Sequence, residues 1–207
     1  RRRESDLGIQ CAKSLAGRKY CRAAGTACAF CLLLNAAVYF QFDPDTTKGD
    51  RGLICGSSML DVKKTSIPDV LILTPRRFGD DRGFFCETWN KERYAQAGID
   101  LDFVQDNHSV SSQVGTVRGL HFQSPPHAQG KLVRCGRGAL LDVAVDVRRG
   151  SPTYGHWVAE ELSAQNGKQL LVPVGFLHGF MTLLPDTEIV YKCTDYYAPE
   201  CDGAVRW

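Results

Sequence analysis

The sequence lacks a long apolar run and a strong excess of charge. Its longest apolar stretch, Ala27–Phe40, is shorter than a membrane span and is interrupted by Asn35, so no transmembrane helix is predicted. The formal net charge is only +2, and residues 1–58 hold the basic excess, with 9 Lys+Arg against 5 Asp+Glu. Residues 59–207 carry 16 Lys+Arg against 18 Asp+Glu. They therefore lack the basic surface that nucleic-acid binding requires.

The common catalytic signatures are also missing. There is no glycine-rich phosphate loop and no Gly-x-Ser-x-Gly motif, which argues against nucleotide hydrolases and serine hydrolases. His121 is followed by Gln123 instead of the second histidine of a His-x-His metal site, and the other four histidines stand alone. Cys28-x-x-Cys31 has no second pair to complete a zinc site. No bound metal is therefore predicted.

The nine cysteines do not form the even, closely spaced set of a disulfide framework. Five lie in residues 1–58, and the other four (Cys86, Cys135, Cys193 and Cys201) are scattered among strand-like segments. Buried free thiols behave as small apolar side chains. We therefore expect reduced cysteines and a cytoplasmic location.

Composition divides the chain at Met59, which is its first methionine. The preceding residues 1–58 are basic and rich in cysteine, like a poor signal or transit segment. We expect them to be an extension that is disordered or not part of the native protein. The remaining 149 or so residues suffice for one well-packed domain, 59–207.

Short β-rich runs separated by turn residues recur throughout residues 59–207, and only Lys91–Ala97, followed by Gly98, is typical of a helix. The predicted strands are Val70–Thr74, Phe84–Trp89, Phe103–Gln105, Thr116–Gln123, Lys131–Arg134, Ala139–Val147, Trp157–Leu162, Gln169–Val172, Gly179–Leu184 and Glu188–Asp195. Many short strands with little helix predict an all-β sandwich or jelly roll.

Titratable side chains are unusually dense in these strands. Burying so many polar groups without purpose is costly, so we expect them to converge on a concave polar pocket. A histidine base, a tyrosine proton donor and a lysine or arginine that holds an anion would support metal-free acid–base chemistry there. By contrast, the paired charges Arg76/Arg77 and Arg148/Arg149 are expected on solvated faces.

Eight motifs resemble those of the dTDP-4-dehydrorhamnose 3,5-epimerase family. They are FGDDRGFF (78–85), FVQDNHS (103–109), RGLHFQ (118–123), PPHAQGKLV (125–133), DVAVDVR (142–148), GSPTYG (150–155), VPVGFLHGF (172–180) and YKCTDYYAPE (191–200). The resemblance runs from Met59 to Trp207 without a large gap.

The resemblance implies a cupin-type jelly roll that forms a homodimer and works without a metal or cofactor. Its substrate would be dTDP-4-dehydro-6-deoxy-D-glucose, which it would convert to dTDP-4-dehydro-L-rhamnose for dTDP-L-rhamnose biosynthesis. His121 would remove the protons at carbons 3 and 5, Tyr191 would return a proton, and Lys131 would stabilise the enolate. Asp142 would support the base.

The resemblance also implies a set of substrate-binding residues, in which Tyr197 would stack on the thymine. The set is Arg82, Glu87, Gln105, Asp106, Asn107, Arg118, Lys131, His178, Tyr197 and Asp202. In the family, an aspartate that partners the base and a further lysine come from a segment beyond the position of Trp207. We therefore expect a chain that is truncated at this point to bind substrate but to turn it over poorly.

Regular alternation along residues 117–122 would place Arg118 and His121 on opposite faces of one strand. Both can reach one pocket only if the backbone is irregular, and Gly119 is the position that would tolerate a bulge. We therefore predict a β-bulge at Gly119.

Three other functions compete with the double epimerase. A related enzyme could epimerise one centre or isomerise the ketone of another deoxysugar. A non-catalytic cupin could merely bind nucleotide-sugars, although the presence of both His121 and Tyr191 argues against it. A metal-dependent cupin oxygenase is disfavoured because the His-x-His pattern is missing.

Overall fold

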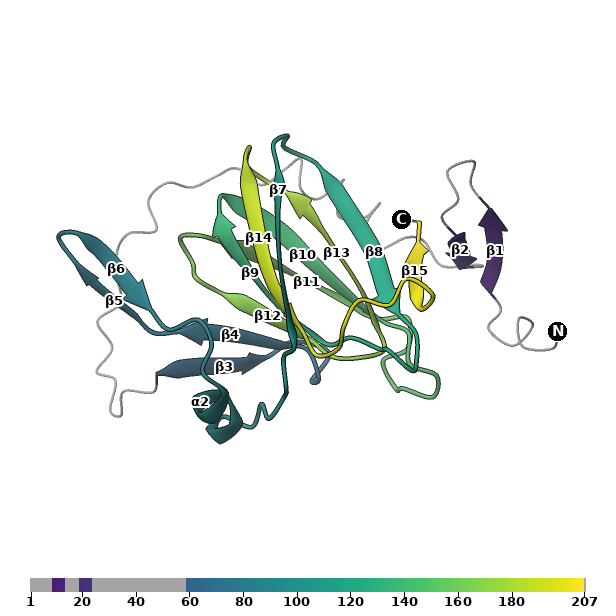
Figure 1. Cartoon of the computed structure of the whole chain (residues 1–207), viewed down its shortest axis with the longest axis horizontal. Helices are drawn as coiled ribbons and strands as arrows, with labels where there is room; N and C mark the ends of the chain where they lie inside the picture. Colours follow the sequence, from purple (N-terminus) through teal and green to yellow (C-terminus); the bar gives the residue numbers. More distant parts are fainter. Residues whose placement is uncertain (1–8, 14–18, 24–58, 207) are drawn as a thin grey trace.

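The computed structural model describes residues 9–13, 19–23 and 59–206 (Figure 1). Among these residues there is one short helix and the rest of the regular structure is β. The elements are β1 Ile9–Lys13, β2 Lys19–Ala23, β3 Leu60–Lys64, β4 Leu71–Pro75, β5 Arg77–Asp80, β6 Gly83–Cys86, α2 Lys91–Gln96, β7 Gln105–Ser111, β8 Val117–Gln123, β9 Lys131–Arg137, β10 Ala139–Asp146, β11 Trp157–Ser163, β12 Gln169–Val172, β13 Phe176–Thr182, β14 Thr187–Cys193 and β15 Asp202–Val205.

Two sheets pack face to face. Sheet A has the strand order β1-β2-β15-β8-β13-β10-β11, and sheet B has the order β3-β4-β12-β9-β14-β7. The main core lies between them, because it contains Leu140 and Phe180 from sheet A together with Val133, Leu170 and Ile189 from sheet B. The expectation of an all-β sandwich of the jelly-roll type is confirmed.

Alternation along the strands decides which side chains enter the space between the sheets. On β10, Leu140 and Ala144 belong to the main core, and Asp142 lies between them on the same face. The intervening Val143 packs in a separate cluster on the other face of sheet A. The side chains of even-numbered residues on β10 therefore point into the space between the sheets, including the charged Asp142.

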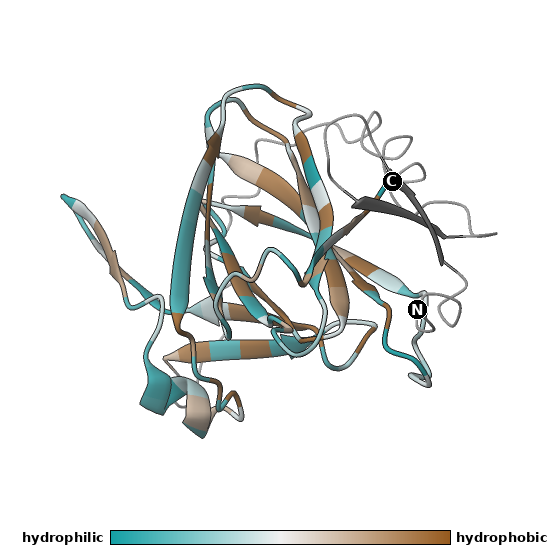
Figure 2. Ribbon diagram, turned by 45° about the vertical axis from the view of Figure 1, so that its right-hand side comes forward, coloured by the Kyte–Doolittle hydropathy of each residue, from teal (hydrophilic) through white to brown (hydrophobic). Residues whose placement is uncertain are grey.

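A hairpin formed by β5 and β6 projects away from the two-sheet body in both ribbon views (Figures 1 and 2). It carries three exposed aromatic side chains, Phe78, Phe84 and Phe85, which are 42%, 61% and 68% exposed. Arg77 lies over the ring of Phe84, at 4.4 Å from the ring centroid. Such a concentration of exposed aromatic surface is typical of an interaction site.

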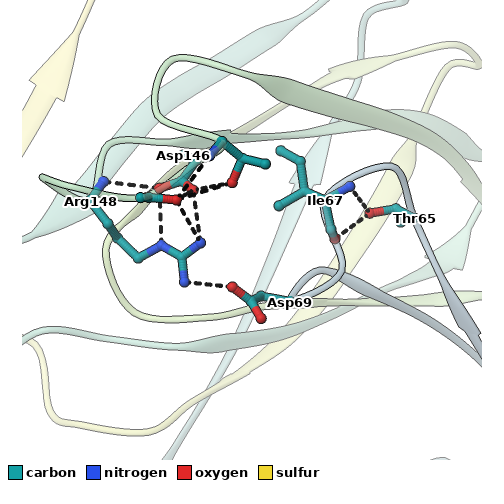
Figure 3. Close-up of polar contacts among 7 residues, drawn as sticks. Thr65, Ile67, Asp69, Asp146 and Arg148 are labelled. Carbon is teal, nitrogen blue, oxygen red and sulfur yellow. Dashed lines mark hydrogen bonds and ion pairs between the residues drawn. The ribbon is translucent and has the colours of Figure 1, made fainter.

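A buried carboxylate anchors the end of β10 (Figure 3). Asp146 is fully buried and accepts two hydrogen bonds from the Arg148 guanidinium, at 2.7 and 3.0 Å. The hydroxyls of Ser151 and Thr153 also donate to it, each at 2.6 Å. Burial alone would raise the pKa of Asp146, but these hydrogen bonds outweigh it and hold the pKa well below its usual range. Arg148 also donates to Asp69 at 2.7 Å and so links β10 to the β3–β4 connection.

The expectation that Arg148 and Arg77 belong to solvated charge pairs is wrong. The Arg148 side chain is 31% exposed and lies over the ring of Phe176, in addition to its two carboxylate partners. Arg77 donates to the backbone carbonyls of Ala164 and Gln165, at 2.6 and 2.8 Å. Both guanidiniums therefore tie separate segments together, which adjacency in the sequence could not reveal.

The predicted β-bulge in β8 is confirmed. His178 of β13 pairs with His121, and Phe180 pairs with Arg118. The two paired positions are therefore three residues apart on β8 but only two apart on β13, which means that β8 contains one extra residue. Gly119 lies in the extra step and has φ +128°, a conformation that side chains rarely adopt. A Cβ at this position would come within 2.5 Å of the Gly179 Cα and 2.9 Å of the His178 carbonyl oxygen.

Most predicted strands are present, with shifted ends. Gln169–Val172 is found with the predicted bounds, and the helix ends one residue earlier than predicted. The segment from Gln105 to Ser111 forms a full strand, whereas only Phe103–Gln105 was predicted, because its run of polar residues masks the alternation. Five strands were not predicted, namely β1, β2, β3, β5 and β15.

Most of residues 1–58 lies outside the residues that the structure describes, and so do Ala27–Phe40 and the Cys28–Cys31 pair. Within the described segments, β1 pairs with β2, and β2 pairs in parallel with β15. None of the described helices is long and apolar enough to cross a membrane. Cys86, Cys135, Cys193 and Cys201 are free thiols, as predicted.

The glycine contact generates a first prediction. Gly119→Ala should lower the free energy of unfolding by about 3 kcal/mol or more, because the new Cβ must displace backbone atoms. Gly115→Ala is the matched control, since Gly115 also has a positive φ (+76°) but has open space around its Cβ position. It should cost about 1–2 kcal/mol, from backbone strain alone. Denaturant unfolding of both variants measures the difference, and equal losses would show that the close approach to Gly179 is unimportant.

Candidate active site

Strands from both sheets direct polar side chains into one end of the interior. The inner faces can be followed through the strand register, because directly paired residues in antiparallel strands share a face. In sheet B, Tyr191 pairs with Asn107 and Val133, and Val133 belongs to the main core. The next inward row joins three paired residues, Gln105, Cys193 and Lys131.

Sheet A supplies a matching set of inward groups. Phe180 is a core residue, and Arg118 pairs directly with it, while His178 lies two residues away on the same strand and face. His121 pairs with His178. The bulge at Gly119 therefore places Arg118 and His121 on the same inner face, as the sequence required.

The buried pair His178–Asp142 lies beside His121. The Asp142 carboxylate is fully buried, and its Oδ1 is 2.8 Å from His178 Nε2. His178 is 7% exposed, whereas His121 is half-buried. The sheet therefore presents one accessible imidazole and one that is held by a carboxylate.

Lys131 and Tyr191 project from sheet B, opposite this group. Burial lowers the pKa of Lys131 below its ordinary value, and the nearby charges of Cys193, Asp142 and Asp202 only partly oppose the change. Burial raises the pKa of Tyr191, against a smaller opposing effect of Arg118. Tyr191 therefore keeps its proton at neutral pH, as a proton donor must.

Arg118 bridges the two sheets. Its Nε donates to the Ser111 hydroxyl at 3.1 Å, and its Nη2 donates to the Val110 carbonyl oxygen at 3.3 Å. Both partners belong to β7, at the edge of sheet B. These contacts leave further N–H groups of the guanidinium for an anionic ligand.

A series of hydrogen bonds connects the substrate-binding candidates of β7 with the loop that follows β14. The Tyr197 backbone N–H donates to Gln105 Oε1 at 2.9 Å, and Gln105 Nε2 donates to Asn107 Oδ1 at 3.1 Å. Asn107 Nδ2 in turn lies 3.5 Å from Cys193 Sγ. The Tyr197 side chain is 56% exposed and is free to stack on a flat ligand.

Sequence reasoning missed the role of Gln123, which it considered only as the residue that breaks a His-x-His pattern. Gln123 is buried, and its amide donates to the carbonyl oxygens of His127 and Tyr196, at 2.6 and 3.1 Å. Its Oε1 accepts from the Ala198 N–H at 2.9 Å. Gln123 therefore holds the loop that carries Tyr197, and only its inward position two residues after His121 hinted at this.

Three of the expected substrate-binding residues lie apart from the inner group. Arg82 is on the projecting β5–β6 hairpin, where it pairs with Asp80 at 2.5 Å. Glu87 follows that hairpin and lies 3.4 Å from Arg93. Asp106 is exposed on the outer face of β7 and pairs with Lys192 at 2.9 Å.

Asp202 occupies an intermediate position. It is exposed on β15, where it pairs in register with Gln123 of β8, and its charge influences Lys131. This places it at the margin of the inner group rather than within it.

A cavity of about 240 Å³ lies elsewhere, over the outer side of β7, β14 and β9. Asp106, His108, Arg134 and Lys192 line it, together with Asn107 and Tyr191, whereas His121, Lys131 and His178 do not. The converging inner groups therefore identify the candidate site better than this cavity does.

The inner group can perform enolate chemistry. It combines an accessible imidazole, a tyrosine that remains protonated and a half-buried lysine, which suit the roles of base, acid and oxyanion partner. Within the described residues, no three His, Cys, Asp or Glu side chains gather in a way that could hold a metal ion.

Comparison with known proteins points to one family of enzymes. The family model described as dTDP-4-dehydrorhamnose 3,5-epimerase matches residues 64–207. A protein of that name from Sinorhizobium fredii is 59% identical over 142 residues, which are 69% of this chain and 73% of the relative.

Two solved structures share the fold. The Bacillus anthracis dTDP-4-dehydrorhamnose 3,5-epimerase, with TDP and PPi bound, is 50% identical, with a TM-score of 0.70 over 72% of this chain and 85% of the other. The Legionella pneumophila dTDP-6-deoxy-D-glucose-3,5-epimerase, in complex with dTDP-4-keto-L-rhamnose, is 46% identical, with a TM-score of 0.69 over 72% and 78% of the two chains. The two-sheet fold, the converging side chains and the match over residues 64–207 show that this chain belongs to the dTDP-4-dehydrorhamnose 3,5-epimerase family.

Proposed function

We propose that the protein epimerises carbons 3 and 5 of dTDP-4-dehydro-6-deoxy-D-glucose to give dTDP-4-dehydro-L-rhamnose, on the route to dTDP-L-rhamnose. The observation that carries this proposal is the placement of His121 and Tyr191 on the inner faces of opposite sheets. A base and an acid on opposite walls can address opposite faces of one sugar ring, as inversion requires. The ligands of the two solved relatives support a nucleotide-sugar substrate.

The chemistry follows from the ketone at carbon 4 of the substrate. A proton on carbon 3 or carbon 5 is acidic because the electrons of the broken C–H bond can move onto the ketone oxygen. His121 accepts that proton, and the Lys131 ammonium stabilises the enolate oxygen. Tyr191 gives a proton to the opposite face of the carbon, the enolate collapses to the ketone, and solvent restores both side chains. The substrate itself supplies the electron sink, so the proposed reaction uses no added cofactor.

The remaining inner residues would hold the nucleotide. Arg118 offers charge-assisted hydrogen bonds to a diphosphate, and His178 adds a further polar contact. Gln105 and Asn107 line the inner face of β7, and Gln105 also fixes the backbone of Tyr197, whose ring would stack on thymine. Asp202 pairs in register with Gln123 of β8, and its charge acts on Lys131.

We also propose that the protein is a cytoplasmic homodimer. The free thiols of the described cysteines support a reducing compartment. The projecting β5–β6 hairpin supports a dimer, because three exposed phenylalanines need a partner surface. A second copy would also explain how Arg82 could contact a nucleotide, although it lies far from the inner group of its own chain.

The dimer proposal predicts that Phe84→Glu/Phe85→Glu yields monomers, because two charges would replace the apolar surface of the hairpin. Light scattering coupled to size-exclusion chromatography measures the mass. Val114→Glu is the matched control, since Val114 is a similarly exposed apolar residue (59%) on the β7–β8 turn. A wild-type protein that elutes as a monomer would contradict the proposal.

The central prediction concerns solvent exchange at the sugar. The protein, incubated with substrate in heavy water, should introduce two deuterium atoms per product molecule, at carbons 3 and 5. His121→Ala should reduce incorporation by about 100- to 10,000-fold, the usual contribution of a general base. Mass spectrometry counts the labels, and NMR gives the configuration of the product.

The control for this experiment is His156→Ala, since His156 is an exposed histidine on the turn before β11. It should incorporate both labels at the wild-type rate. A single label with one inverted centre would replace the proposal with a single-centre epimerase. Absence of label despite nucleotide-sugar binding would favour a binding protein.

The shifted pKa of Lys131 predicts an early alkaline limit of activity. A lowered pKa means that the ammonium loses its charge at a lower pH than a free lysine, so kcat/KM should begin to fall below pH 10.5. Tyr191 should not cause this alkaline limb of the pH–rate profile, because its own pKa is raised. Tyr191→Phe should therefore lower the rate while leaving the limb in place. Lys131→Arg should move the limb to higher pH, and an unchanged limb would assign it to another group.

A further inference from the structure

Asp142 is buried in an unusual way. It is fully buried within sheet A, and His178 accounts for one of its carboxylate oxygens. The other, Oδ2, has no hydrogen-bond partner among the described residues. Burying a carboxylate with an unsatisfied oxygen costs several kcal/mol of stability. A functional role for Asp142 would explain why it is kept at this position.

Strand order determines which histidine Asp142 can serve. Sheet A has β13 between β10 and β8, so Asp142, His178 and His121 follow one another across three neighbouring strands. Two strand spacings separate Asp142 from the base, which is about 10 Å of backbone. His178 occupies the strand between them and makes the hydrogen bond itself.

The contact fixes the ring of His178. An ionised carboxylate only accepts hydrogen bonds, so the arrangement places a proton on Nε2 and directs it to Asp142. When the ring is neutral and Nε2 carries the proton, Nδ1 is unprotonated and can accept a hydrogen bond from a ligand hydroxyl. Without the carboxylate, the ring could rotate or exchange its tautomer.

We propose that Asp142 is a positioning residue for His178, and not for the base His121, and that it holds the Nε2–H tautomer so that Nδ1 accepts a hydroxyl of the sugar. Asp142 then contributes to substrate binding and orientation rather than to proton abstraction. Its negative charge also favours the charged form of the buried Lys131, against the effect of desolvation. The role in substrate binding rests on the proposed function, whereas the tautomer of His178 does not.

Nitrogen-15 NMR of the histidine rings tests the tautomer without any substrate. The wild-type protein should show His178 protonated at Nε2, and Asp142→Asn should change this signal because an amide can donate to Nε2. A wild-type ring that carries a proton on Nδ1, alone or together with Nε2, would overturn the proposal, because that nitrogen could not accept a hydrogen bond. This measurement uses the wild-type protein and does not depend on whether the variant folds.

Kinetics then separates the two histidines. Asp142→Asn should raise KM about tenfold, with a smaller fall in kcat, and His178→Ala combined with Asp142→Asn should be no worse than His178→Ala alone. Asp146→Asn is the matched control, since it removes another fully buried carboxylate from the same face of β10. It should lower stability but leave KM and the His178 ring signals unchanged.

Two results would contradict the positioning role. If the effects of Asp142→Asn and His178→Ala simply multiply, the two residues act independently. If Asp142→Asn lowers kcat and deuterium incorporation without changing KM, then Asp142 serves the base. If the wild-type protein shows no epimerisation at all, the proposed function fails, while the NMR result still stands.

Discussion

The close contact between Gly119 of β8 and Gly179 of β13 determines what the site can contain. The two backbones approach so tightly that a Cβ on Gly119 would meet the Gly179 Cα at 2.5 Å, and a Cβ on Gly179 would meet the Arg118 carbonyl oxygen at 2.8 Å. This approach accommodates the extra residue of the bulge, and the bulge turns Arg118 and His121 to the same side of the sheet. Without it, a regular strand would send the phosphate-binding candidate and the base to opposite faces. The glycines are thus a structural requirement of the chemistry, although neither takes part in it.

The interior tolerates its polar groups because most of them are paired across strands. Arg118 reaches β7, the Gln105–Asn107 pair spans two rows of the same strand, and Gln123 makes three hydrogen bonds to the loop that carries Tyr197. Satisfied groups of this kind cost little and keep the side chains in fixed positions. The Asp142 carboxylate is the exception among the described residues, since one of its oxygens stays unpaired. Unsatisfied polar groups that persist in a core are expected where function requires them.

The sequence permitted accurate prediction where periodicity and local steric rules decide the structure. Alternation identified β10, and the conflict between Arg118 and His121 located the bulge, because a period of two leaves no other solution. Long-range contacts were not predictable in this way. Arg148 stands beside Arg149 in the sequence, yet it contacts Asp69, almost eighty residues earlier. Asp106 belongs to the same polar run as Gln105 and Asn107, but the pleat turns it outward to Lys192. Motif resemblance alone does not distinguish these faces, whereas the register does.

Lys131 and Tyr191 show how one physical effect prepares two groups for one reaction. Burial disfavours charge, so it weakens the hold of Lys131 on its proton and strengthens that of Tyr191. Both changes favour neutral side chains. In the proposed reaction, the substrate would bring a ketone whose oxygen becomes negative as His121 removes a proton, and that charge would develop beside Lys131. The enolate oxygen would then replace the water that solvates a lysine ammonium outside the protein. Their attraction would be strongest when the enolate is fully formed. The burial that lowers the pKa of Lys131 would therefore stabilise the enolate more than the ketone in the proposed reaction, and this difference would accelerate it.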